Sequence, residues 1–209
     1  MQTNLRQLFV ATLVLAAAPY SGAAIVNPSF ESPGGSGSFP QADDWGGQAT
    51  TALHASFGPG AFTDAGASFA FNNPGQPDAT QTLVDTFAAD TTYTFKSYST
   101  SSGTNNDIQF LIGYDSGGGF IQLAEATYDL NAFTTSWELL DGVTYSTGSV
   151  GSELGEQIIV RISGVNTGSG NSSAVWFDNV SLTSVPVPEP GSLALLGLGG
   201  LLVFRRQRG

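Results

Sequence analysis

The 209-residue sequence contains no cysteine and little positive charge. Without cysteine the fold cannot rely on disulfide bonds, and thiol chemistry is excluded. Between residues 24 and 184 there are sixteen acidic residues but only two basic ones, Lys96 and Arg161, which gives that region a net charge of −14. Because nucleic-acid binding requires clustered Lys and Arg side chains, we expect no nucleic-acid partner. Cations and uncharged or weakly cationic ligands fit this charge better.

Motifs for catalysis are also lacking. The only histidine, His54, has no nucleophile motif around it, and the sequence has neither Gly-x-Ser-x-Gly nor His-Glu-x-x-His. We therefore expect His54 to be a surface or packing residue. The neighbouring Asp43 and Asp44 would point to opposite faces of a strand, whereas glycoside cleavage needs two facing carboxyl groups, roughly 5 to 10 Å apart. The sequence predicts that the protein is not an enzyme.

Long apolar runs are absent, and two short ones lie near the ends of the sequence. The first, Leu8–Ala18, follows a segment with one arginine and no acid, and it precedes small residues at Ser21–Ala24. This pattern predicts a signal peptide over residues 1–23, with cleavage after Ala23 or Ala24. The run is too short for a first membrane-spanning helix.

The second apolar run, Ser192–Phe204, would span roughly 20 Å as a helix, less than the ~30 Å hydrocarbon core of a membrane. A proline-flanked acidic residue precedes it, and arginines that favour the cytoplasmic side follow it. This arrangement resembles the PEP-CTERM signal of exported bacterial proteins. The resemblance implies transient insertion into the inner membrane and removal of the tail by an exosortase, a membrane-embedded cysteine protease. The expected tail is 185–209, with Val185–Pro190 as an extended spacer. Its signal residues are Val187, Pro188, Glu189, Pro190, Arg205, Arg206 and Arg208.

Between these segments the sequence alternates with a period of two residues and contains no long amphipathic helix. In Thr91–Ser99, Tyr93 and Phe95 share one face and Tyr98 lies on the other. Further strands are expected at Ser68–Phe71, Gln81–Phe87, Ile108–Tyr114, Phe120–Ala126, Ser136–Val143, Ile158–Ile162 and Val175–Leu182. In the last of these, the alternation places four residues on one face: Trp176, Asp178, Val180 and Leu182. Many short strands with glycine-rich turns predict an all-β fold, an antiparallel two-sheet jelly-roll sandwich over residues 24–184.

Short motifs occur in a fixed order along this region: Asn27–Glu31, Trp45, Gln81–Leu83, Thr92–Phe95, Ser136–Glu138 and Val175–Leu182. In this order they resemble jelly-roll carbohydrate-binding modules of the galactose-binding-like kind. The resemblance implies that the opening and closing strands lie close together. It also implies that an acidic residue of each, Glu31 and Asp178, contributes to a structural calcium site completed by backbone carbonyls. The alternative is that Glu31 is a solvated surface acid and Asp178 a turn residue at a strand end.

Aromatic side chains are the candidates for ligand binding, because a planar ring can stack on the apolar face of a sugar. Trp45 lies between Asp44 and Gly46, and is either a lid of the core or a platform carried by a loop. Tyr98 points away from the apolar face of its strand, and Tyr114 ends a strand beside a glycine-rich loop. We expect these residues to include the ligand contacts. By contrast, two tryptophans in strand-like contexts are expected in the core, namely Trp137 and Trp176.

These patterns together predict an exported protein that is transiently anchored in the membrane and then resides at the cell surface or in the extracellular matrix. Its expected role is non-catalytic binding of a glycan, the exopolysaccharide of the producing cell. The alternative is a structural matrix or coat protein without a specific ligand, whose acidic surface confers solubility and swelling. A polysaccharide hydrolase or lyase is disfavoured by the missing catalytic motifs.

Overall fold

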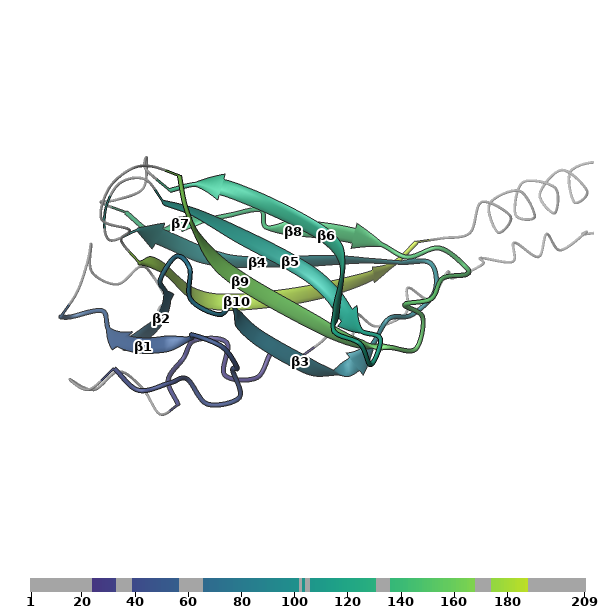
Figure 1. The fold of residues 1–209 in the computed structure, drawn as a ribbon, viewed down its shortest axis with the longest axis horizontal. Coiled ribbons are helices and arrows are strands. Elements are labelled where there is room, and N and C mark those ends of the chain that lie inside the picture. The colour runs from purple at the N-terminus through teal and green to yellow at the C-terminus, as the bar shows by residue number, and fades with distance from the viewer. Residues whose placement is uncertain are drawn as a thin grey trace, which may run out of the picture.

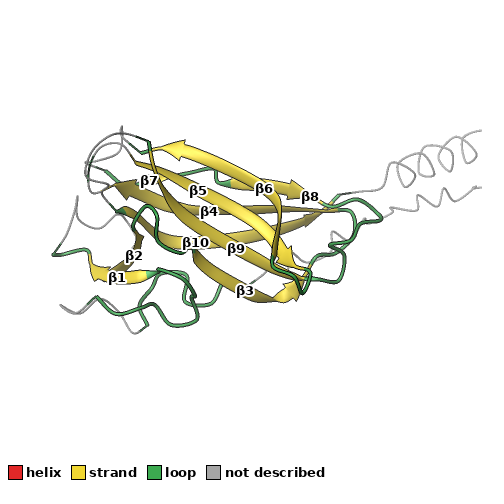
Figure 2. Cartoon of the chain, in the orientation of Figure 1, coloured by secondary structure: helices red, strands yellow, loops and turns green. Residues whose placement is uncertain are grey.

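The computed structural model describes residues 24–32, 39–56, 66–101, 103, 106–130, 136–167 and 174–187. The expected signal peptide and the apolar run of the sorting tail lie outside these ranges. The described residues form ten β-strands and no helix, as the all-β prediction requires (Figure 2). Accordingly, this part of the chain contains no helix that is long and apolar enough to span a membrane.

The strands form two antiparallel sheets that pack face to face, and this confirms the expected jelly-roll sandwich (Figure 1). Sheet A has the strand order β1-β2-β10-β4-β7, and β8 also pairs with β4. Sheet B has the order β3-β9-β5-β6. The bounds in sheet A are β1 Thr50–Leu53, β2 Ser68–Asn72, β4 Thr91–Ser101, β7 Glu138–Leu139, β8 Val143–Ser146 and β10 Val175–Pro186. Those in sheet B are β3 Ala79–Thr86, β5 Asn106–Asp115, β6 Phe120–Asp129 and β9 Gln157–Asn166.

The main core lies between the two sheets and follows from the period-two alternation. In β4, Tyr93 and Phe95 are buried, whereas Thr92 and Thr94 are half-exposed on the other face. Sheet B contributes a row of aliphatic side chains to the same core, among them Ile108, Ile112, Ile158, Val160 and Ile162. Burial of this apolar surface is the main favourable term in folding.

Strand β10 changes faces halfway along its length, and the expected alternation is wrong there. Trp176 and Asp178 lie on the outer face of sheet A, as an alternating strand requires, but Val180 and Leu182 lie in the main core. The cause is a β-bulge between Asp178 and Ser181, where Asn179 adopts a left-handed φ of 47°. One extra residue reverses the parity of a strand, and asparagine tolerates the left-handed region better than most residues.

Two further differences concern the strand boundaries. The expected strand Ser136–Val143 is interrupted by Gly142, which has a φ of 66° and whose added Cβ would overlap the Phe95 carbonyl. The second difference is the end of β10, which was expected at Leu182. The strand continues through Val185 and Pro186, which pair with β4. The first residues of the expected spacer are therefore part of the sandwich.

Phe177 is the residue whose truncation best tests this core. It is fully buried, and its ring contacts Phe30 edge-on with a centroid distance of 5.4 Å. We expect Phe177→Ala to lower the free energy of unfolding by about 3 to 5 kcal/mol in urea titrations, because the cavity adds to the lost transfer energy. Val84 is 88% exposed, so the control Val84→Ala should cost about 0.5 kcal/mol or less. A loss below about 1 kcal/mol for Phe177→Ala would contradict the packing.

Candidate functional site

A second aromatic cluster covers the outer face of sheet A, on the side opposite the main core. It is built around Phe69 of β2 and Trp176 of β10, whose ring centroids are 5.0 Å apart. Trp137, from the segment before β7, packs on both rings at centroid distances of 5.5 and 6.5 Å. Phe69 and Trp176 are buried, whereas Trp137 is only partly buried. We call Phe69, Trp137, Trp176 and the neighbouring Tyr98 the aromatic face.

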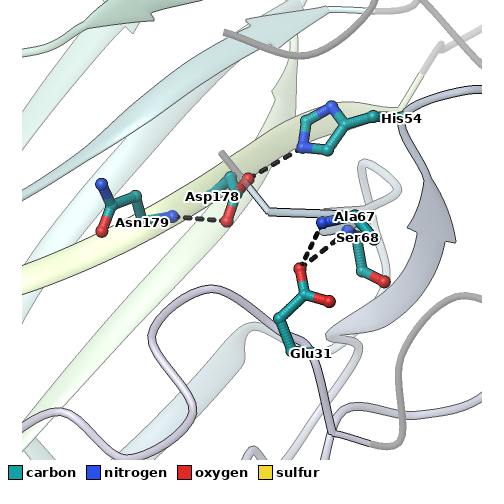
Figure 3. Close-up of polar contacts among 6 residues, drawn as sticks. All are labelled: Glu31, His54, Ala67, Ser68, Asp178 and Asn179. Carbon is teal, nitrogen blue, oxygen red and sulfur yellow. Dashed lines mark hydrogen bonds and ion pairs between the residues drawn. The ribbon is translucent and has the colours of Figure 1, made fainter. Parts of the chain in front are cut away.

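Beneath Trp137 lies a buried polar pair, His54 and Asp178. The His54 Nε2 and Asp178 Oδ2 atoms are 2.9 Å apart, and both side chains are almost completely enclosed (Figure 3). The His54 ring packs against the rings of Phe69 and Trp137, with centroids 5.1 Å from each. The pair therefore ties the end of β1 to β10 and fixes the ring against which Trp137 rests.

Burial dominates the electrostatics of this pair. It raises the pKa of Asp178 from an ordinary value of 3.8 to about 6, because a carboxylate loses its hydration there. The hydrogen bonds from His54 and from the Asn179 amide favour the charged form and oppose the rise. The negative charge of Glu31 adds to it. The folded structure therefore favours the protonated form of Asp178 more than water does.

The two acids expected to bind calcium do come into one neighbourhood. Asp178 is fully buried on β10, and Glu31 is exposed and lies beside the start of β2 (Figure 3). Glu31 Oε1 accepts hydrogen bonds from the backbone amides of Ala67 and Ser68, each at 2.8 Å. Asp178 Oδ1 accepts the Asn179 amide at 2.6 Å, and Oδ2 contacts His54.

This donor set fits calcium only in part. Three of the four carboxylate oxygens contact nitrogen atoms of the protein, and no group of three or more His, Cys, Asp or Glu side chains that could hold a metal occurs in the described ranges. Calcium takes six to eight oxygen ligands. Backbone carbonyls would have to supply most of them, and the ion would have to compete with His54 for Asp178.

Of the three aromatic residues expected to bind ligand, only Tyr98 lies on the aromatic face. Its Cα pairs with Asp178 of β10 and with Leu139 of β7, and its side chain is half-exposed. Trp45 is 4% exposed and packs against Phe30 in the main core, so the structure places it as the lid of the core. Tyr114 is 7% exposed in the main core, and its hydroxyl contacts Ser152 at 3.1 Å.

Sequence reasoning missed His54, Phe69, Trp137 and Trp176 as members of one site. His54 was expected at the surface or in packing, and it does pack, but as the partner of Asp178. The two tryptophans are largely buried as expected, yet they pack outside the main core. A detectable pattern was present, because Phe69 and Phe71 alternate with the core residue Ala70 and so place aromatic rings on the outer face. The bulge in β10 leaves no comparable trace in the sequence.

The partly exposed side chains of this arrangement are aromatic, and its buried polar pair is enclosed. Tyr98 and Trp137 present partly open rings, which can stack on an apolar surface. Asp178 has no exposed area and cannot touch a ligand stacked on the outer surface in this conformation. We therefore treat His54 and Asp178 as positioning residues for Trp137.

The raised pKa of Asp178 predicts a pH-dependent stability. The contribution of the protonated carboxyl group is complete below about pH 3.8 and is lost as the pH rises through about 6. A rise of roughly two pKa units corresponds to about 3 kcal/mol. In urea titrations with a chelator present, wild type should lose about 2 to 3 kcal/mol more than Asp178→Asn between about pH 4 and about pH 7. Asp141→Asn, which alters an exposed acid, should follow wild type. Parallel profiles for wild type and Asp178→Asn would contradict the assignment.

Known structures share the fold of this sandwich. A cyclase from Fischerella sp. TAU superimposes with a TM-score of 0.64 at 18% identity, covering 81% of this chain and 100% of the cyclase. The CBM22-1-CBM22-2 tandem domain of Xyn10C from Paenibacillus barcinonensis gives a TM-score of 0.51 at 15% identity, covering 83% of this chain and 50% of the tandem domain. At these identities the likeness concerns the fold alone. No curated protein sequence is significantly similar to the chain.

The C-terminal end matches a family model over residues 186–208, described as the PEP-CTERM protein-sorting motif. The match includes the Val187–Pro190 segment and the arginines that the sequence nominated. It begins at the last residue of β10, so the sorting motif follows the sandwich without an intervening linker. The chain is thus a protein with a PEP-CTERM sorting motif, whose body has the jelly-roll fold that carbohydrate-binding modules also use.

Proposed function

We propose that the protein is an exported, non-catalytic glycan-binding module of the cell surface or extracellular matrix, and that its ligand is an exopolysaccharide. The aromatic face is the observation that carries this proposal. Tyr98 and Trp137 are partly exposed on the outside of sheet A, and the Trp137 ring packs on the buried rings of Phe69 and Trp176. Rigid rings at a surface lose little conformational entropy when a sugar stacks on them.

The charge of the body narrows the ligand class. With a net charge of −14 between residues 24 and 184, the protein repels polyanions. Neutral or weakly cationic polysaccharides meet no such barrier. Stacking and neutral hydrogen bonds depend little on ionic strength, so binding should persist at physiological salt.

The sorting motif supplies the route to the cell surface. The PEP-CTERM motif supports export and processing of the tail by an exosortase, with transient contact between the tail and the inner membrane. Glu189 and its flanking prolines resist helix formation, which suits them to be an extended recognition segment outside the apolar run. The mature protein then leaves the membrane and joins the matrix.

A structural matrix protein without a specific ligand is the second candidate. The acidic surface favours it, because like charges keep such a protein solvated. The two candidates differ in one measurable property, which is the retention of the folded body on a purified polysaccharide.

Affinity electrophoresis of residues 24–187 in a gel that contains neutral exopolysaccharide makes this test. We expect Tyr98→Ala and Trp137→Ala each to weaken binding roughly five- to a hundredfold, which corresponds to about 1 to 3 kcal/mol for the loss of one stacking ring. Tyr114→Phe is the matched control, because this ring is buried in the main core. The variant should bind the polysaccharide as tightly as the wild type does. Circular dichroism verifies the fold of each variant. If no neutral glycan retards the wild type, the structural role replaces the binding role.

Calcium is a separate proposal that rests on Glu31 and Asp178. If calcium binds only the folded state, a concentration about one hundred times the Kd stabilises the fold by about 2.7 kcal/mol. We expect a higher thermal midpoint in calcium than in chelator, and we expect Glu31→Gln to abolish the difference. The effect should shrink as the pH falls, because protons compete with the ion for the two carboxylates. If the melting curves superimpose and elemental analysis finds no metal, the two carboxylates bind no calcium and only accept hydrogen bonds from the protein.

A further inference from the structure

The first described residues lie beside β3, the outermost strand of sheet B. Gln81 of β3 uses its side chain to pair with the backbone of Val26: its Oε1 accepts the Val26 amide at 2.9 Å, and its Nε2 donates to the Val26 carbonyl at 2.8 Å. Two residues earlier, the backbone nitrogen of Ala24 lies 3.0 Å from Asp85 Oδ2. The segment therefore runs antiparallel to β3 and contacts side chains of that strand, whose backbone pairs with Gly46 at Thr80.

Asp85 lies beside the Ala24 nitrogen, which would carry a positive charge if the chain began at Ala24. In the uncleaved chain, the Ala24 nitrogen is a neutral amide with one donor. After cleavage before Ala24 it becomes an ammonium group, and a carboxylate 3.0 Å away then forms a charge-assisted bond, roughly twice as strong as a neutral one. The body has only two basic side chains, so this ammonium group is one of few cations in a strongly acidic domain.

We propose that export processing cuts the bond between Ala23 and Ala24 and that Asp85 is the counter-ion of the new N-terminus. This inference rests on the proposed export. The hydrolysis consumes one water molecule, leaves a carboxylate on Ala23 and creates the ammonium group on Ala24. Asp85 then holds the mature N-terminus beside β3, which protects the terminus from trimming.

The same end of the sandwich carries the exit of the sorting tail. The Val187 amide donates a hydrogen bond to the Asp90 carbonyl, with a donor–acceptor distance of 2.6 Å. Asp90 lies on the connection between β3 and β4, five residues after Asp85 of β3. Strand β10 and strand β3, which borders the N-terminal segment, both end at this end of the molecule (Figure 1). Trp176 lies ten residues before Pro186 on β10, about 30 Å away at the usual rise of a strand. Trp176 is thus remote from the end of the sandwich where Ala24 and Val187 lie.

The first test is the mass and N-terminal sequence of the protein isolated from the surface of cells that make the full chain. A mature form that begins at Ala24 supports the proposal. A form that begins at Ile25 or at another internal residue overturns it while leaving export intact. A form that retains Met1 also overturns the proposal, whereas absence of the protein from the cell surface would overturn export itself, and with it the function proposed above.

The second test measures aminopeptidase trimming of the exported protein and its variants. Asp85→Asn should accelerate loss of Ala24 about two- to fivefold, the range given by exposed ion pairs. Asp85→Glu should restore much of the protection, and Asp141→Asn, which removes the same charge from another exposed position, should trim at the wild-type rate. A mature N-terminus at Ala24 with equal trimming of wild type and Asp85→Asn would refute the role of Asp85.

Discussion

The β-bulge at Asn179 is the constraint on which the arrangement of this domain depends. It lets one central strand serve two apolar regions that lie on opposite faces of sheet A. Before the bulge, Trp176 and Asp178 face outward, and after it, Val180 and Leu182 fill the main core. A strand without the bulge would bury Asp178 among apolar side chains or expose Val180 and Leu182, and either change would be unfavourable.

The buried pair of His54 and Asp178 affects both the stability of the domain and the position of Trp137 on its surface. A carboxyl group on the outer face of a sheet would normally be solvated, but Asp178 is fully buried against His54, whose ring packs on Phe69 and Trp137. The enclosure raises the free-energy cost of the charged carboxylate, and the hydrogen bonds from His54 and the Asn179 amide offset part of that cost. The pair therefore supports Trp137, the partly exposed tryptophan of the aromatic face.

Much of the fold could be predicted from the sequence because period-two alternation reports burial directly. The strands that contain Tyr93, Ile108 and Val160 were expected within about four residues of their observed bounds. The strand β1 was missed, since its four residues are too few to show a period. Trp45 and Tyr114 were expected as ligand contacts on local context, and they lie in the core because distant strands cover them. Tyr98 was placed on its correct face, since alternation within β4 is regular.

The sequence by itself determined the all-β class, the acidic character of the body and the sorting motif at its end, because each depends on composition or on residues that are neighbours in the chain. Only the tertiary structure decided that His54 meets Asp178 across 124 positions, that Glu31 caps the start of β2, and that Ala24 meets Asp85. These contacts depend on strand order and on one bulge. Both are consequences of how the whole chain packs, and a local pattern carries no record of them.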